Sequence, residues 1–182
     1  FGTIADRIAS DIAPQTVLDV GCTQGVLVES LRRRGIEAYG VEASGCVIES
    51  IHPEFRPYCW AGSLTASFPR RYDLIVALEL VEHMTAEQAE LAVANLCQHS
   101  DDILFSSTPA DYKDIAHINV QPPDYWAALF ARRGFFRDTD FDASFIMPWA
   151  ARFRRTDEPV PRLVGGYERR LWLLHQESKA TR

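Results

Sequence analysis

Hydrophobic positions along the 182-residue chain follow two different periods. Short apolar runs predict buried strands, and stretches in which apolar residues recur every three or four positions predict helices. Strands are predicted over residues 15–20, 36–42, 55–60, 72–78, 102–107, 135–141 and 170–176. Helices are predicted over residues 3–12, 24–34, 44–51, 86–98 and 123–133. Because strands and helices alternate, the pattern predicts an α/β fold with a doubly wound sheet of seven strands and helices on both faces.

The turn after the first predicted strand carries the most informative motif. Residues 17–25 read VLDVGCTQG, with Asp19 at the carboxyl end of the strand, where open α/β sheets bind ligands. Gly21 and Gly25 let the backbone turn sharply and approach a bound molecule. Glu42 ends the second strand, near the spacing of about 20 residues at which a Rossmann acid reaches a ribose hydroxyl. The order strand, turn, helix, strand and acid predicts a nucleoside-binding site.

The glycine spacing distinguishes among nucleoside ligands. It departs from the G-x-G-x-x-G of dinucleotide sites, and an acid at Asp19 would repel a pyrophosphate but suit a cation. The run DVGCTQG resembles motif I of the class I S-adenosylmethionine (SAM)-dependent methyltransferases, usually D-x-G-C-G-x-G, and Glu42 resembles their ribose-binding acid. The resemblance covers most of residues 15–140. It implies a Rossmann-like, mostly parallel sheet whose last strand is antiparallel, with SAM as the cofactor.

The resemblance implies cofactor contacts from four places in the chain. The predicted cofactor-binding residues are Asp19, Gly21, Cys22, Thr23, Gln24, Gly25, Glu42, Ala43, Gly62, Ser63, Leu64, Leu78 and Glu79. Two of them depart from the family pattern. Thr23 replaces the usual middle glycine and should crowd the methionine end of SAM. Ser63 replaces an acid that contacts adenine, so backbone groups would have to anchor the base.

Polar residues that could carry the chemistry follow the fourth and fifth predicted strands. Glu79, Glu82 and His83 lie at i, i+3 and i+4, so a helical turn would place them on one side. Because histidine titrates near neutrality, His83 and His117 are the predicted general bases for an oxygen acceptor, and Asn119 is predicted to orient it. The first turn of a helix also favours acids, and a loop histidine is often only a surface residue.

A metal-assisted mechanism is the alternative. Glu-x-x-Glu-His followed by a later histidine resembles the metal-binding set of plant small-RNA 2′-O-methyltransferases, and the same motif occurs in ubiquinone-pathway O-methyltransferases. This resemblance implies that Glu79, Glu82, His83 and His117 hold Mg²⁺, Mn²⁺ or Zn²⁺, which would make the acceptor hydroxyl more acidic. Many metal-independent relatives also carry a Glu-His pair, so both mechanisms stay open.

Composition limits the class of protein. A hydrophobic content of 47% fits one globular domain over residues 1–182, and a net charge of −6 argues against a general nucleic-acid binder. Four cysteines without a C-x-x-C pair indicate reduced thiols and a cytoplasmic location. No apolar run is long enough to span a bilayer, and the start, Phe1, indicates a piece of a longer chain.

Residues 142–169 are predicted to be an insertion on the acceptor side. Phe145, Trp149 and Phe153 recur at i, i+4 and i+8, which predicts an amphipathic helical stripe that packs on the core or covers a pocket. Neighbouring arginines, which suit phosphates, are Arg152, Arg154 and Arg155. Together with the run HINVQPPDYWAALFARRGF, the segment resembles small bacterial methyltransferases linked to sugar and polysaccharide assembly. That likeness implies a sugar or glycan hydroxyl, nucleotide- or lipid-linked, with other small molecules open.

The sequence also bears on two other classes of function. A catalytically silent SAM-binding domain that serves a larger assembly is compatible with the departures at Thr23 and Ser63. An NAD-dependent oxidoreductase would need a different glycine spacing and a Tyr-x-x-x-Lys pair, and the chain contains neither. The sequence therefore favours a SAM-dependent O-methyltransferase.

Overall fold

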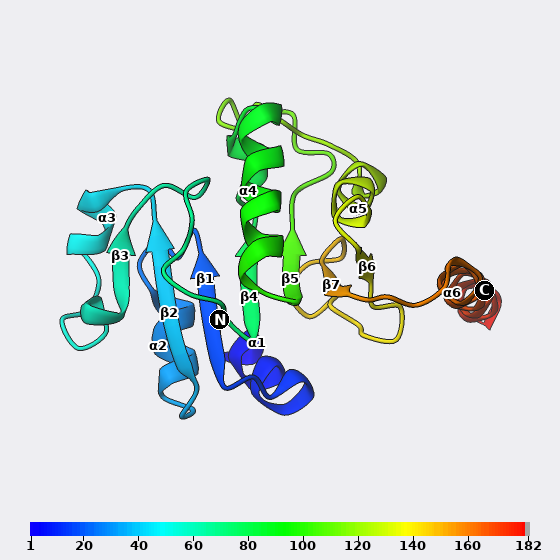
Figure 1. Cartoon of the computed structure of the whole chain (residues 1–182), viewed down its shortest axis with the longest axis horizontal. Coiled ribbons are helices and arrows are strands. Elements are labelled where there is room, and N and C mark those ends of the chain that lie inside the picture. Colours follow the sequence, from blue (N-terminus) through cyan, green and yellow to red (C-terminus); the bar gives the residue numbers. More distant parts are fainter. Residues whose placement is uncertain (181–182) are drawn as a thin grey trace.

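The computed structural model describes residues 1–180, which form a seven-stranded sheet of order β3-β2-β1-β4-β5-β7-β6 (Figure 1). The strands are β1 (Thr16–Val20), β2 (Glu37–Glu42), β3 (Cys59–Ala61), β4 (Leu74–Leu78), β5 (Asp102–Ser106), β6 (Phe135–Arg137) and β7 (Ala151–Arg155). The first five strands are parallel, and β7 is antiparallel to both β5 and β6. The predicted fold class is confirmed, including the antiparallel last strand.

Helices cover both faces of this sheet. The helices of the described chain are α1 (Gly2–Arg7), the π-helix η1 (Ile8–Ile12), α2 (Val26–Arg32), α3 (Gly45–Glu49), η2 (Arg56–Tyr58), η3 (Val81–His83), α4 (Ala86–His99), α5 (Pro123–Ala131) and α6 (Val160–Ala180), and α6 covers neither face. Val93 of α4 and Phe130 of α5 belong to the core on one face, while Ala5 of α1 and Leu27 of α2 belong to the core on the other. No helix in the described part of the chain has the length and apolar character needed to cross a membrane.

The arrangement follows from the local sequence. The strand residues Leu74–Leu78 are nearly all buried, as expected of a parallel strand covered on both faces. The helix α4 begins in a capping box, in which the Thr85 side chain accepts a hydrogen bond from the Gln88 backbone and the Gln88 side chain accepts one from the Thr85 backbone. The chain goes from β1 outward to β3 and then returns to β4, so the strand order reverses between β1 and β4, where such folds bind ligands.

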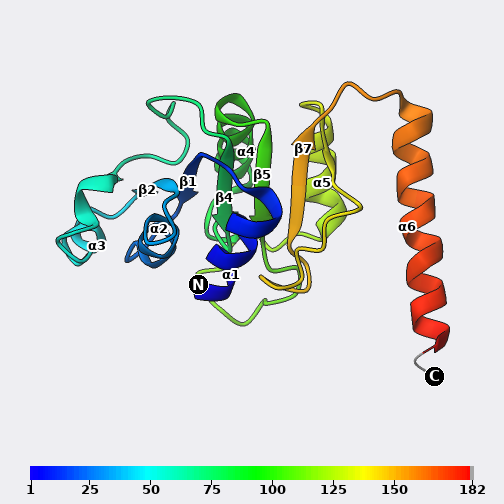
Figure 2. The ribbon, with the colours of Figure 1, turned by 90° about the horizontal axis from the view of Figure 1, so that it is seen from below.

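The C-terminal third differs from the prediction. The strand predicted over residues 170–176 is wrong, because these residues lie in α6 (Figure 2). Their apolar run consists of Leu171, Trp172, Leu173 and Leu174, without the β-branched residues typical of strands. The helix lies beyond the β6 edge of the sheet, where the Tyr167 hydroxyl accepts a hydrogen bond from the Arg137 N–H at 3.1 Å, and it keeps these four side chains exposed. The strand that completes the sheet is β7, which comes earlier in the chain.

The helical stripe predicted from Phe145, Trp149 and Phe153 is also wrong. Phe153 lies in β7 and stacks on Phe130 with the ring centroids 4.2 Å apart, whereas Phe145 and Trp149 lie in the segment before the strand. Residues 151–155 alternate buried and more exposed side chains at their start, which is the period of a strand. Residues 142–169 thus contain β7 and the beginning of α6.

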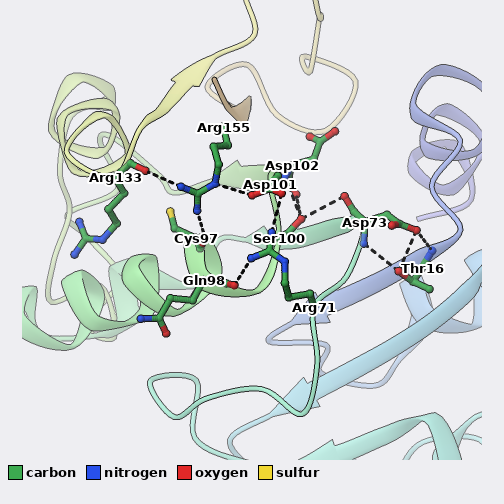
Figure 3. A network of polar contacts seen from close by, with 10 residues as sticks. All are labelled: Thr16, Arg71, Asp73, Cys97, Gln98, Ser100, Asp101, Asp102, Arg133 and Arg155. Carbon is green, nitrogen blue, oxygen red and sulfur yellow. Dashed lines mark hydrogen bonds and ion pairs between the residues drawn. The ribbon is translucent and has the colours of Figure 1, made fainter. Parts of the chain in front are cut away.

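The two ends of β7 lie at opposite edges of the sheet. Because it runs antiparallel to β5, Ala151 pairs with Phe105 at the carboxyl end of β5, whereas Arg154 pairs with Asp102 at the amino end. Figure 3 shows the polar network at the amino ends, where Arg155 binds Asp101 with Nε 2.6 Å from Oδ1. Asp102 likewise pairs with Arg152. These arginines therefore lie at the edge of the sheet opposite the carboxyl ends of the parallel strands.

Candidate active site

The turn between β1 and α2 holds a backbone conformation that only small residues tolerate. Gly21 has φ +80°, and its N–H donates to the Val41 carbonyl at 2.8 Å. A Cβ atom on Gly21 would lie 2.8 Å from Cδ1 of Leu80, which is closer than real contacts allow. Gly25 also has a positive φ of +70°. Gly21 therefore brings this turn against Leu80, which follows β4, and the predicted sharp turn at the two glycines is present.

The Glu42 carboxylate closes the same turn. Its Oε2 accepts a hydrogen bond from the Thr23 N–H at 3.1 Å, and its Oε1 accepts one from the Ser44 N–H at 3.1 Å. Thr23 has φ +45°, so it takes the left-handed conformation that glycine usually adopts there. Each carboxylate oxygen keeps a lone pair for a further donor. Glu42 can thus shape the turn and still bind a hydroxyl.

Asp19 lies in β1 just before this turn, and the pKa of its carboxyl group is raised. Its side chain is buried at the end of β1. Burial, together with the negative charge of Glu42, raises the pKa of Asp19 from 3.8 to about 7. The negative charges of these two carboxyl groups repel each other, and a positively charged ligand would relieve that repulsion.

The predicted cofactor residues beyond β2 and β3 gather around one open hollow of about 400 Å³. Its lining includes Ala43, Gly62, Ser63 and Leu64, together with Met84 and Gln88. The Ser63 hydroxyl is hydrogen-bonded to the Thr65 hydroxyl at 3.0 Å. Of the remaining predicted contacts, Cys22 is buried, Gln24 is exposed, and Leu78 lies half-buried at the end of β4.

Glu79 lies in a different position from the one that the sequence spacing predicted. It has φ +48°, and the helical turn η3 begins only at Val81, so Glu79, Glu82 and His83 do not share one helical turn. The Glu79 N–H donates to the Ser106 carbonyl at 3.0 Å, and its Oε1 accepts from Nε1 of Trp149 at 2.9 Å. A positive φ in a non-glycine residue costs energy and often marks a functional site.

Three of the four predicted metal-ligating residues come together. One ligand atom from each of Glu82, His83 and His117 lies within 4.8 Å of the others, and the two imidazole centroids are 4.8 Å apart. Glu82 is fully buried, and its Oε2 has no hydrogen-bond partner among the described residues. Burial and the negative charge of Glu79 raise the Glu82 pKa. An unpartnered buried carboxylate oxygen beside two imidazoles fits a divalent cation, so the residues present are compatible with a metal ion.

Backbone carbonyls determine which nitrogen of each imidazole is available. Nδ1 of His83 is 3.2 Å from the Ala116 carbonyl oxygen, and Nδ1 of His117 is 3.1 Å from that of Asp111. Because a carbonyl can only accept, each Nδ1 carries the proton, and in the neutral ring Nε2 keeps the lone pair. Both Nε2 atoms are thereby prepared to take up a proton or bind a cation.

Asn119 holds the loop that carries His117. Its N–H donates to the Glu82 carbonyl at 3.0 Å, its Nδ2 donates to the Val81 carbonyl at 3.3 Å, and its Oδ1 accepts from Gln121 at 3.0 Å. These contacts fasten the loop after β5 to η3. They give Asn119 a positioning role, and its predicted contact with an acceptor stays a prediction.

Sequence reasoning did not find two residues at this edge of the sheet. Trp149 contacts Glu79, although the pattern had assigned it to a helical stripe, and the Ser106 hydroxyl accepts from the Glu79 N–H at 3.2 Å. The alternation of Ala151 and Phe153 with arginines was the available signal, because it predicts a strand whose start must lie beside Trp149.

Comparison with known proteins identifies the class. Residues 3–137 match the family described as "Methyltransferase domain", and the chain belongs to this family. It is 26% identical over 157 residues to a ubiquinone biosynthesis O-methyltransferase from Nitrosomonas europaea, covering 79% of this chain and 62% of that protein. The chain thus spans less than two thirds of this relative. The predicted methyltransferase resemblance is confirmed, whereas none of the proteins named here is linked to sugars or polysaccharides.

Solved structures show the same fold. Magnesium protoporphyrin IX methyltransferase from Synechocystis PCC 6803, crystallised with bound SAH, aligns with a TM-score of 0.71 and 14% identity over 85% of this chain and 81% of that one. The small RNA methyltransferase HEN1 aligns with a TM-score of 0.66 and 17% identity over 87% of this chain and 25% of that one. At such identities the likeness supports the fold alone.

Proposed function

We propose that this chain binds SAM and transfers its methyl group to a hydroxyl oxygen of a small-molecule acceptor. The observation that carries the proposal is the cluster of Glu82, His83 and His117, whose ligand atoms lie within 4.8 Å of one another at the carboxyl edge of the sheet. Membership of the methyltransferase family supports the transfer, and the relative from ubiquinone biosynthesis supports oxygen as the acceptor atom. Four free cysteines are compatible with the expected cytoplasmic location.

The cofactor site is built from the glycine turn and two carboxylates. In this proposal Glu42 accepts hydrogen bonds from the ribose hydroxyls, and Asp19 neutralises a positive charge of the methionine part of SAM. The hollow bounded by Gly62, Ser63 and Leu64 receives the adenine, with backbone groups replacing the acid that Ser63 lacks. In this proposal the four predicted regions of cofactor contact, around Gly21, Glu42, Gly62 and Leu78, belong to one site.

The chain's own residues would move a single proton. When bound, SAM supplies a methyl group activated by a sulfonium, so an acceptor oxygen forms the new C–O bond as the C–S bond breaks. Nε2 of His83 or His117 takes the proton of the acceptor hydroxyl. A divalent ion held by Glu82, His83 and His117 would instead make that hydroxyl more acidic. Positioning and exclusion of water by the surrounding side chains provide the rest of the acceleration.

The acceptor is better described as a small oxygenated molecule than as a phosphate-linked glycan. The arginines that had suggested a phosphate lie at the opposite edge, where Arg155 pairs with Asp101 and Arg152 with Asp102. The relatives named above include no sugar enzyme. A sugar hydroxyl is still chemically compatible with the site. Sugars are therefore included in the test as comparison acceptors.

The proposal is tested by incubating the protein with methyl-labelled SAM and two sets of acceptors. The first set contains phenol and the three dihydroxybenzenes, and the second contains free sugars and sugar nucleotides. We expect labelled methyl ethers from the first set, in amounts that depend on active protein. SAM binding without transfer to any acceptor would favour the catalytically silent alternative. Transfer only to sugars would restore the glycan acceptor.

The raised pKa of Asp19 predicts that SAM binds more tightly as the pH rises. Between its ordinary pKa of 3.8 and the folded value of about 7, the folded protein holds a proton that the unfolded chain releases. This group's contribution to stability is therefore present below pH 4 and is lost as the pH rises through 7. A bound cation requires the carboxylate, so affinity should rise about tenfold per pH unit up to pH 7 and then level off. Calorimetric titrations from pH 5.5 to 8.5 measure this slope.

The matched variant is Asp19→Asn, which keeps the size of the side chain but cannot ionise. We expect it to bind SAM weakly with an affinity that no longer depends on pH in this range. A wild-type affinity that is constant from pH 5.5 to 8.5 would contradict the role of Asp19 as the partner of a cation.

A further inference from the structure

The C-terminal helix α6 leaves an apolar stripe in solvent beyond the β6 edge of the sheet (Figure 2). The side chains of this stripe, called here the α6 seam, are between 39% and 69% exposed, and they are Val160, Val164, Tyr167, Leu171 and Leu174. Successive members are four, three, four and three positions apart. That is the heptad spacing of the a and d positions that meet in a two-stranded coiled coil, and it is narrower than the apolar face of a helix that covers a core.

The rest of the protein contacts a different side of α6. Gly166 and Arg170 are half-buried, and a Cβ atom on Gly166 would lie 3.6 Å from Oγ1 of Thr139. Since successive residues of a helix are about 100° apart, the α6 seam lies about a third of a turn away from this side. Tyr167, at the border of the seam, fastens the helix to the sheet through its hydrogen bond with the Arg137 N–H. The α6 seam is thus held by the protein and directed into solvent.

A second copy of α6 fits the seam in one antiparallel register. When Leu171 of one copy lies opposite Leu174 of the other, Tyr167 lies opposite Ser178. Each of these layers occurs twice, because the pairing has twofold symmetry. Within the described helix the two copies overlap over residues 165–180, a length of about 24 Å. Such a pairing closes after two copies, so it gives a dimer and not a filament.

The charged residues beside the α6 seam favour this orientation. Arg170 and Glu177 take g positions of the heptad, and Glu168 and His175 take e positions. In the antiparallel dimer Arg170 lies beside Glu177 of the other copy, and Glu168 lies beside His175, which can donate a hydrogen bond to it. In a parallel dimer Arg170 would instead face His175, and Glu168 would face Leu163. Within the described helix, only the antiparallel arrangement therefore pairs both acids with bases.

We propose that α6 is a dimerisation helix, and that its seam packs antiparallel against the α6 seam of a second copy of this chain. The inference concerns assembly and is independent of the proposed function. Pairing buries the leucines that now lie in solvent, which is the main favourable contribution to association. The flanking charges determine the partner and the register, as they do in coiled coils.

Sedimentation equilibrium of the whole 182-residue protein measures the association. We expect a reversible monomer–dimer equilibrium in the micromolar range. The double variant Leu171→Lys with Leu174→Lys should raise the dissociation constant of the dimer at least about 100-fold, because charged groups would replace four buried leucines. Trp172→Lys is the matched control, since Trp172 is also exposed on α6 but lies outside the seam. It should change the constant less than about threefold.

Charge reversal tests the register without removing apolar surface. Arg170→Glu and Glu177→Arg, made separately, should each weaken the dimer about tenfold, because like charges would then face each other across the seam. Combining the two substitutions restores opposite charges and should return the dissociation constant to within about threefold of the wild type. The two residues also lie 3.8 Å apart within one helix, so circular dichroism is needed to distinguish a loss of helix from a loss of dimer.

Cysteine cross-linking determines the orientation, in a Cys46→Ser background because Cys46 is exposed. An equal mixture of Tyr167→Cys and Ser178→Cys should form a disulfide-linked heterodimer in air, since these positions face each other in the antiparallel register. Ser178→Cys alone should stay unlinked, because its two copies would lie about 16 Å apart along the dimer.

A protein that stays monomeric up to near-millimolar concentration would overturn the proposal. A dimer that survives the two leucine substitutions, or that Trp172→Lys weakens equally, would also overturn it, because another surface would then hold the copies together. Self-linkage of Ser178→Cys, without linkage in the mixture, would replace the antiparallel arrangement by a parallel one and overturn the proposed register.

Discussion

Replacing both His83 and His117 by alanine is expected to lower turnover by about 10²- to 10⁴-fold, which is the usual contribution of acid–base catalysis. The affinity for SAM should remain within about twofold, because neither imidazole belongs to the glycine turn or to the hollow beyond β3. Each single variant should cost nearly as much as the double one, since residues that act as a unit are not additive. Steady-state kinetics with separate SAM titrations measure both quantities.

The exposed His175 on α6 offers a matched control, and His175→Ala should keep full turnover. Full activity of the double variant would remove the histidine base and the metal ligation together. Exhaustive chelation separates these two mechanisms. If a divalent ion acidifies the acceptor, chelation abolishes turnover, Mg²⁺, Mn²⁺ or Zn²⁺ restores it, and Glu82→Gln prevents the restoration. If a histidine is the base, turnover survives chelation.

Glu42→Ala is expected to weaken SAM binding by about 100-fold or more, because hydrogen bonds to a charged group contribute about 1.5–3 kcal/mol each. The variant loses the proposed contacts with the ribose. It also loses the carboxylate that accepts hydrogen bonds from the N–H groups of Thr23 and Ser44 and so holds the turn in place. Glu42→Gln retains one carbonyl oxygen, so its affinity for SAM should lie between those of the wild type and Glu42→Ala. Calorimetry measures the affinities, and thermal unfolding checks that the variants remain folded.

This substitution has a second expected consequence. The charge of Glu42 helps to raise the pKa of Asp19, so its removal should shift the pH dependence of any residual SAM binding to lower pH. Glu37→Ala provides a control on the same strand, since Glu37 lies at the other end of β2 and pairs with Arg70 on the surface. Unchanged affinity in Glu42→Ala would contradict the assignment of the cofactor site.

Local patterns predicted the N-terminal two thirds of the fold well. Apolar runs determined β1, β2, β4 and β5, since a strand buried on both faces leaves few polar positions. The glycine turn and Glu42 were also visible, because the positive φ of Gly21 and the acid after β2 depend on residues close in the sequence. The grouping of His83 with His117 followed from the rule that the carboxyl ends of parallel strands share one edge.

Only the tertiary structure decided the rest. Glu79 looked like a member of the Glu82 cluster, but its left-handed backbone turns it toward Trp149, a residue 70 positions away. The last strand was assigned to the apolar run in α6, because a short apolar run does not distinguish a strand from a helix. The packing of Phe153 on Phe130 fixes the place of β7 in the sheet. Because β7 is antiparallel to β5, Trp149 lies at the site and the arginines lie at the far edge. Such contacts join distant segments, and no local period encodes them.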